Sequence, residues 1–267
     1  MTQTHPSPAR VSKDTVKLPA CHIDPRRVHI ILVEPIYAGN VGAVARIMNN
    51  FGFRNLRIVG SIPHKNDFYL AMHSEEILVN ASLYDDLASA VADMDRVIAF
   101  SRRVGKLKPI DYTPVEMAEY VGGTKGLEVG LVFGRETFGL TDAEADLCPI
   151  RCHIPANPEF PSINLAQAVA IAVWELYSLP HSHKRDARTL PVSGIELDRI
   201  KAYMLDVMRD AGFFRSHEST NWDAFLGRML HRLNPGRTMV WRFKQMFNRW
   251  HVLVTGKGKG YEHNDQE

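Results

Sequence analysis

Three short segments of this sequence combine turn-forming glycines or prolines with polar side chains that could do chemistry. These polar residues are Asn40 and Arg46 in segment 33–46, Glu136 in segment 131–140, and Ser162 and Asn164 in segment 154–166. Amide, hydroxyl, carboxylate and guanidinium groups can orient a ligand and stabilise charge that develops on it. The last segment precedes a predicted helix, and backbone N–H groups at a helix N-terminus bind polar ligands. The segments therefore suggest a site for a polar cofactor.

Each of these residues also has a purely structural explanation. Asn40 lies where an N-cap would start a helix, and Arg46, six residues later, can be an ordinary surface arginine. Glu136 follows an apolar run and can be the carboxylate at a helix entry. Either Ser162 or Asn164 can cap the helix that follows. Spacing alone leaves both explanations open at each position.

The three segments lie where apolar runs of strand length meet loops. These runs are rich in valine and isoleucine and do not alternate with polar residues, which is typical of buried parallel strands. Strands that alternate with helices predict an α/β fold, a parallel sheet with helices on both faces, and such sheets bind ligands at the carboxyl ends of their strands. The predicted strands are 29–33, 56–59, 97–100, 130–134 and 151–154, and the predicted helices are 41–51, 75–80, 87–94, 115–120, 142–147 and 164–177.

The rest of the chain is predicted to surround a domain at residues 28–180. Residues 1–27 are predicted to form a flexible arm, 181–194 a polar linker, and 195–267 a small, basic helical extension. The apolar faces of that extension are predicted to be Ile195, Ile200, Tyr203, Val207 and Met208; Trp222, Phe225, Met229 and Leu233; and Met239, Phe243, Met246 and Trp250.

Charge and composition narrow the function classes. The net charge is only +2, but residues 224–260 contain no acid, and their basic side chains are interleaved with aromatic ones, which suits contact with RNA. No apolar run approaches the roughly 20 residues of a membrane helix, and the N-terminus lacks a signal-peptide core, so we expect a cytoplasmic protein without membrane contact. Three cysteines and a His-x-His at 181–183 do not complete a ligand set, so no metal is expected.

In this order, the three segments resemble the signature motifs of the SPOUT methyltransferases. Asn-x5-Arg, Phe-Gly-x-Glu and Ile-Pro…Ser-x-Asn-Leu occur together within residues 28–177. The chain is most similar to the TrmH-like class, and within it to the TrmJ family. This resemblance implies a C-terminal trefoil knot, which periodicity does not predict because knots are rare. It also implies S-adenosyl-L-methionine as cofactor and a homodimer with the active site near the subunit interface.

The resemblance also implies a role for individual residues. The cofactor would contact Phe100, Ser101, Arg102, Gly134, Ile154, Pro161, Ser162 and Ile163, largely through the backbone. The catalytic or substrate-positioning residues would be Asn40, Arg46, Glu136, Ser162 and Asn164. The family mechanism has Arg46, assisted by a substrate phosphate, remove the proton of a ribose hydroxyl. A guanidinium normally stays protonated, so Arg46 could instead stabilise alkoxide charge.

The function implied by the resemblance is S-adenosylmethionine-dependent methylation of a ribose 2′-hydroxyl in tRNA, at nucleotide 32 of the anticodon loop. One alternative is a ribosomal RNA 2′-O-methyltransferase of the same TrmH-like class. The other is a non-catalytic RNA-binding module that keeps the SPOUT fold. The RNA that accepts the methyl group distinguishes the two enzymes, and binding of the cofactor distinguishes both of them from the module.

Overall fold

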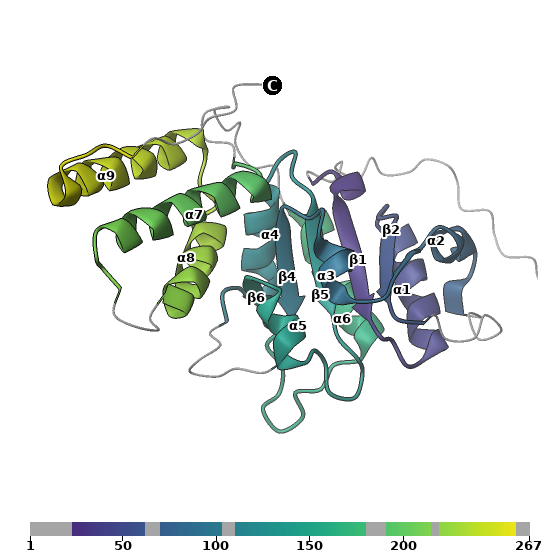
Figure 1. Cartoon of the computed structure of the whole chain (residues 1–267). Helices are drawn as coiled ribbons and strands as arrows, with labels where there is room; N and C mark the ends of the chain where they lie inside the picture. The colour runs from purple at the N-terminus through teal and green to yellow at the C-terminus, as the bar shows by residue number, and fades with distance from the viewer. Residues whose placement is uncertain (1–22, 62–69, 103–109, 180–190, 215–218, 260–267) are drawn as a thin grey trace, which may run out of the picture.

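A parallel sheet of six strands lies at the centre of the protein, in the order β3-β2-β1-β5-β4-β6 (Figure 1). The computed structural model describes residues 23–61, 70–102, 110–179, 191–214 and 219–259. Every pairing in the sheet is parallel, as the apolar runs predicted. The strands are β1 (Val28–Val33), β2 (Asn55–Val59), β3 (Ser82–Tyr84), β4 (Arg96–Phe100), β5 (Val129–Phe133) and β6 (Ile150–Cys152).

Helices cover both faces of the sheet, which confirms the predicted α/β class. Successive residues of a strand point to opposite faces, so Ile30 and Leu32 join one apolar core while Ile31 and Val33 join another. The helices of the first core are α1 (Ala38–Asn50), α2 (Glu75–Val79), α4 (Pro114–Gly122) and α6 (Leu165–Ser178), and those of the second are α3 (Leu87–Val91) and α5 (Asp142–Asp146). The trefoil knot implied for this sheet stays a prediction.

Two helix starts matter for the site. The expectation that Asn40 is an N-cap is wrong, because α1 begins at Ala38 with Tyr37 at the N-cap, and Tyr37 makes no side-chain cap. Asn40 is therefore the third residue of α1, and Arg46 lies in its third turn. At α6 the prediction is confirmed: Asn164 is the N-cap, and its side chain accepts hydrogen bonds from the first turn.

Three further helices, α7 (Gly194–Asp210), α8 (Ser219–Leu233) and α9 (Arg237–Thr255), share a separate apolar core beside β4 and β6 (Figure 1). The predicted faces of α8 and α9 are partly wrong. Each is rotated by one residue, about 100° around the helix, so that Leu226 and Leu230, and then Val240, form the buried centre. The side chains predicted to be buried but found exposed are Ile195, Phe225, Leu233, Met239 and Met246.

A fully buried arginine fixes these helices to the sheet. The guanidinium of Arg96 donates to the Asn234 side chain, with N···O distances of 3.0 and 3.1 Å, and to the Val192 carbonyl at 2.8 Å. The neighbouring Asp95 carboxylate accepts from the Gly194 backbone N–H at 2.7 Å, at the start of α7. Buried and partly buried hydrogen bonds therefore join the helical core of α7, α8 and α9 to the sheet.

The proposed boundaries of the arm, domain, linker and extension stay predictions. Residues 1–22 and 180–190, which hold most of the arm and the linker, lie outside the described residues. The described residues at their edges make specific contacts. Ile23 is buried, Arg27 donates to the Gly126 carbonyl at 2.8 Å, and the Val192 N–H donates to the Pro235 carbonyl at 3.0 Å.

His231, at the end of α8, lies where the helices meet the sheet. Its carbonyl accepts a hydrogen bond from the Tyr120 hydroxyl at 2.6 Å. Its Nδ1 is buried and has no hydrogen-bond partner among the described residues. Burial, with a smaller effect from the charge of Arg96, lowers the pKa of His231 to about 3. The folded protein therefore holds this imidazole neutral across a pH range in which the unfolded chain protonates it.

We expect His231→Leu to make the stability less sensitive to acid. The unfolded chain binds a proton near the ordinary histidine pKa of 6.5, and the folded protein does not, so the free energy of unfolding falls as the pH drops from 6.5 toward 3. The variant should lose roughly 2 kcal/mol less than the parent between neutral pH and about pH 4.5, measured by urea unfolding. His73→Gln, at an exposed histidine, is the control. An equal loss in parent and His231→Leu would contradict this expectation.

Candidate active site

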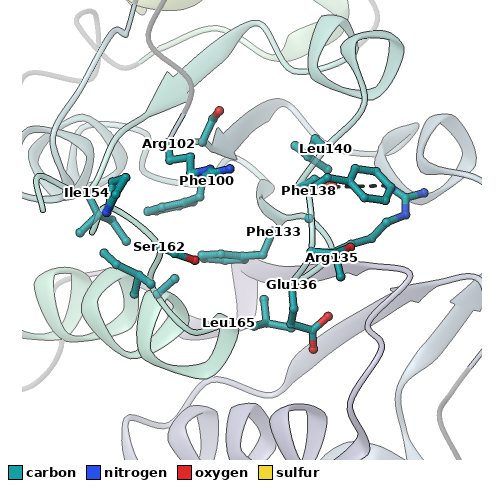
Figure 2. A pocket seen from close by; sticks show the side chains of 17 residues that line it. Phe100, Arg102, Phe133, Arg135, Glu136, Phe138, Leu140, Ile154, Ser162 and Leu165 are labelled. Atoms are coloured by element: carbon teal, nitrogen blue, oxygen red, sulfur yellow. Dashed lines mark hydrogen bonds between the residues drawn. The ribbon is translucent and has the colours of Figure 1, made fainter. Parts of the chain in front are cut away.

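A pocket opens at the carboxyl ends of β4 and β5, where open parallel sheets bind ligands (Figure 2). Its enclosed part measures about 130 Å³, and the pocket continues from there into solvent. The structure places all eight residues predicted to contact the cofactor on its walls: Phe100, Ser101, Arg102, Gly134, Ile154, Pro161, Ser162 and Ile163.

One wall of the pocket is aromatic and another is backbone. The rings of Phe100 and Phe133 stack with centroids 4.4 Å apart and an angle of 15° between their planes. The opposite wall is the loop after β5, where a Cβ atom on Gly134 would lie 2.2 Å from the backbone carbon of Gly139. Only glycine allows this close approach. A flat apolar wall beside backbone polar groups suits a planar ligand with polar edges.

Hydrogen bonds join the polar residues of the three segments. The Asn40 amide donates to the Glu136 carboxylate at 2.8 Å, and the Asn164 amide donates to the Asn40 carbonyl oxygen at 2.9 Å. Glu136 also accepts from the backbone N–H groups of Ile36 and Tyr37, at 3.0 and 3.3 Å. It thus supplies the cap that the start of α1 lacks, and it holds Asn40 in one orientation.

This chain of side chains starts at the wall of the pocket. Glu136 and Ser162 both line the pocket, and Asn164 follows Ser162 by two residues. Asn164 is fixed in turn, because its side-chain oxygen accepts from the backbone N–H groups of Ala166 and Gln167 at 2.9 and 3.3 Å. The structure therefore brings together four of the five residues predicted to be catalytic.

Arg46 is the fifth, and the structure places it elsewhere. Its side chain is exposed in the third turn of α1. Six residues of helix correspond to about 9 Å along the axis between Asn40 and Arg46. Arg46 is not among the residues that line the pocket of this chain. Any role for Arg46 in the chemistry therefore requires contact with a substrate or with a second subunit.

Arg135 is a further candidate residue of the site that was not predicted from the sequence, although it lies next to Glu136 just after strand β5. Its guanidinium donates to the Glu34 carboxylate at 2.8 Å and to both oxygens of Glu144 at 2.9 Å. It also lies over the Phe138 ring, 5.0 Å from the centroid. These partners raise the pKa of Arg135, and its hydrogen bond lowers the pKa of Glu34. The sequence signal for Arg135 was the pair of charged residues, Arg135 and Glu136, directly after a buried strand.

The described residues contain no group of three histidine, cysteine or acidic side chains that could hold a metal ion. Burial raises the pKa of Cys148 and of Cys152 to about 12, so both are protonated thiols at neutral pH. Cys21 and the His-x-His at 181–183 lie outside the described residues. A search of the described helices found none with the length and hydropathy needed to cross a membrane.

Comparison with known proteins identifies the family of this chain. Residues 27–174, which contain all three segments and the whole pocket, match the SpoU rRNA Methylase family. The chain belongs to this family. The resemblance to SPOUT methyltransferases of the TrmH-like class, inferred from the motifs, is thereby confirmed.

Two TrmJ proteins are similar to this chain in sequence, and one of these matches is much longer than the SpoU domain. The tRNA (cytidine-2′-O-)-methyltransferase TrmJ of Methanocaldococcus jannaschii is 44% identical over 156 residues, 57% of this chain and 67% of that protein. The tRNA (cytidine/uridine-2′-O-)-methyltransferase TrmJ of Photorhabdus laumondii is 32% identical over 216 residues, 78% of this chain and 90% of that protein. The crystal structure of TrmJ from Z. mobilis aligns with a TM-score of 0.61 at 28% identity, covering 83% of this chain and 97% of that one. Among SpoU methyltransferases, the TrmJ proteins are thus similar to this chain in both sequence and fold.

Proposed function

We propose that this SpoU methyltransferase transfers a methyl group from S-adenosylmethionine to the 2′-hydroxyl of a ribose in tRNA. The observation that carries the proposal is the hydrogen-bonded chain of Glu136, Asn40 and Asn164, which starts at the wall of the pocket. The names of the TrmJ relatives, which are tRNA ribose methyltransferases, support the same reaction. A tRNA substrate fits the cytoplasmic location expected from the sequence.

The pocket fits S-adenosylmethionine. The ring of Phe100, stacked on the buried ring of Phe133, offers a flat surface to the adenine, and the loop that begins at Gly134 offers backbone polar groups to its edge. Arg102 lines the pocket and is exposed, so its positive charge can meet the carboxylate of the methionyl group. When bound, the cofactor supplies an electrophilic methyl group on its sulfonium.

The polar chain would position the ribose. A ribose hydroxyl is a poor nucleophile, so the site must orient it and stabilise the charge that develops on its oxygen. Glu136 already accepts three N–H groups, so its role is to fix Asn40 and the start of α1. Asn40, Ser162 and Asn164 then supply amide and hydroxyl groups for the substrate.

Arg46 would complete the site in a homodimer. Its side chain is exposed on α1, and apolar side chains are exposed beside that helix: Tyr37 is 58% and Trp174, on the adjacent helix α6, is 52% exposed. Exposed aromatic residues of this kind favour a subunit interface. Because Arg46 does not line the pocket of its own chain, we assign its charge to a substrate bound near that interface.

The helical extension would bind the body of the tRNA. On α9, Trp241, Arg242 and Arg249 are exposed, and the stretch 224–260 has no acid to repel phosphate. Exposed arginines give electrostatic contacts that are independent of sequence, and an exposed indole can stack on a base. Target choice at nucleotide 32 would then combine this contact with the geometry of the pocket.

The decisive test is a map of 2′-O-methylation in RNA from cells with and without this protein. We expect one ribose of the tRNA anticodon loop, at nucleotide 32, to lose its methyl group. The description of the matched family favours ribosomal RNA as a second candidate, and loss of a methyl group from ribosomal RNA alone would select it. An unchanged map, together with no calorimetric binding of S-adenosylmethionine, would indicate a non-catalytic module.

A further inference from the structure

Two adjacent residues leave the end of β5 in opposite directions. Figure 2 shows the Glu136 side chain on one side of the loop and the Arg135 guanidinium on the other, alongside the Phe138 ring. Glu136 accepts from the backbone after β1 at Ile36 and Tyr37. Arg135 donates to Glu34, which comes directly after β1. The loop after β5 therefore holds the β1–α1 connection through two side chains, Glu136 and Arg135.

Arg135 is bound equally firmly on its other side. Both oxygens of Glu144 accept from its terminal nitrogens at 2.9 Å, and the Arg135 side chain is only 9% exposed. Glu144 also accepts from the Thr141 N–H at 2.7 Å in the capping box of α5. Burial alone would raise the pKa of Glu144, but the hydrogen bonds from Arg135 and Thr141 lower it overall. Glu144 is thus a charged, preformed anchor.

The loop between these anchors is a wall of the pocket. Backbone hydrogen bonds close it at its base, from the Arg135 N–H to the Gly139 carbonyl at 3.2 Å and back at 2.9 Å. Gly139 has φ +76°, and a Cβ atom on Gly134 would clash with it, so the loop has little freedom to change shape locally. The orientation of the whole loop therefore depends on what holds Arg135.

We propose that Arg135 is a positioning residue, clamped by Glu34 and Glu144, that holds the loop of residues 134–140 in the shape that binds the methyl donor. The proposal rests on the proposed function, because it assumes that the pocket takes S-adenosylmethionine. Glu34 gives the clearest test of this role, because it contacts Arg135 from outside the pocket. It does not line the pocket and its side chain is 57% exposed, and the side-chain contact that links it to the loop is its ion pair with Arg135.

Removing Arg135 leaves two carboxylates without their shared cation. Glu144 is the more affected, because its side chain is only 18% exposed and an uncompensated charge there is costly. The loop would lose its side-chain links to Glu34 and Glu144, and a shift of the freed loop would take Gly134 and Glu136 away from the pocket. Removing Glu34 leaves the Glu144 half of the clamp in place, so the effect is smaller but of the same kind.

The test is calorimetric titration with S-adenosylhomocysteine, the demethylated donor, which binds without turnover. We expect Arg135→Gln to raise the dissociation constant about tenfold and Glu34→Gln about threefold, and the double variant to bind no more weakly than Arg135→Gln, because coupled residues are not additive. Arg135→Lys, which keeps the charge without the bidentate contact, should recover part of the affinity. Glu119→Gln, at an exposed carboxylate of α4, is the matched control.

A kinetic measurement separates positioning from loss of fold. If a variant merely unfolds in part, the rate per mole falls while the KM for the donor stays at the parent value, whereas a displaced loop raises that KM. Parent protein that fails to bind S-adenosylhomocysteine would overturn the proposed function itself. Parent that binds while Arg135→Lys and Glu34→Gln bind equally well would overturn the clamp alone, even if Arg135→Gln does not fold.

Discussion

Replacing Arg46 with alanine is expected to reduce methyl transfer about a thousandfold or more while changing the donor dissociation constant less than about twofold. The guanidinium is exposed and does not line the pocket, so its loss should not change the affinity for the donor. A charge that stabilises the developing alkoxide acts only during the reaction, so its removal lowers the rate and leaves ground-state binding unchanged. Single-turnover transfer to saturating tRNA measures the first quantity and calorimetry the second.

Arg54→Ala removes another exposed arginine, four residues after α1 ends, and should leave the single-turnover rate unchanged. Arg46→Lys keeps the charge and should fall between the parent and the alanine variant. Full turnover by Arg46→Ala would remove Arg46 from the mechanism. A donor affinity that falls in step with the rate would instead mean that Arg46 shapes the pocket.

Gly134→Ala is expected to weaken donor binding about a hundredfold or more, because the added methyl has no space. Its Cβ would lie 2.2 Å from the Gly139 carbon and 2.4 Å from the Leu140 nitrogen, both of which are backbone atoms. No side-chain rotation relieves such a clash, so the loop that walls the pocket must move. Titration with S-adenosylhomocysteine measures the loss, and thermal unfolding reports whether the sheet remains intact.

Gly227→Ala is the matched control for this substitution. It adds the same methyl group in the middle of α8, where the nearest atom is the flexible Lys201 Cδ at 3.7 Å. Alanine in a helix interior is favoured over glycine by roughly 0.5–1 kcal/mol, so this variant should bind the donor normally and unfold at a slightly higher temperature. Normal donor binding by Gly134→Ala would show that the loop adapts and that the close approach has no role in binding.

The sheet could be predicted from sequence because its central strands are mostly apolar. All residues of β5 are buried, and a continuous apolar run of that length admits few alternatives. The short edge strand β3 escaped prediction because it has only three residues, two of them exposed, and no apolar signal. Strands of that kind depend on the pairing offered by their neighbour, which here is β2.

Local signals failed where a partner from elsewhere in the chain decides the structure. Asn40 has the residue type of an N-cap, but α1 starts earlier because Glu136, almost a hundred residues away, accepts the N–H groups of its entry. The predicted faces of α8 and α9 were displaced by one residue, because smaller side chains such as Leu226 and Val240 occupy the centre of the core and aromatic residues such as Trp222 pack around it.

The motif residues could be named from the sequence, but their connections could not. That Glu136, Asn40 and Asn164 form one hydrogen-bonded series follows from the order of strands, which brings β1 and β5 together as neighbours. Arg135 was visible as one half of a charged pair, yet its two carboxylate partners lie in different elements, Glu34 in the β1–α1 loop and Glu144 in α5. Spacing along one segment cannot reveal a cluster built from three.

The buried guanidinium of Arg96 couples the methyltransferase sheet to the C-terminal helices. Cutting the chain after α6 would remove the Asn234 and Val192 oxygens that accept from Arg96 and leave it the Asp95 carbonyl. Loss of these helices would then destabilise β4, whose last residue, Phe100, lines the pocket. A molecule truncated after α6 is therefore expected to be less stable in the sheet that remains.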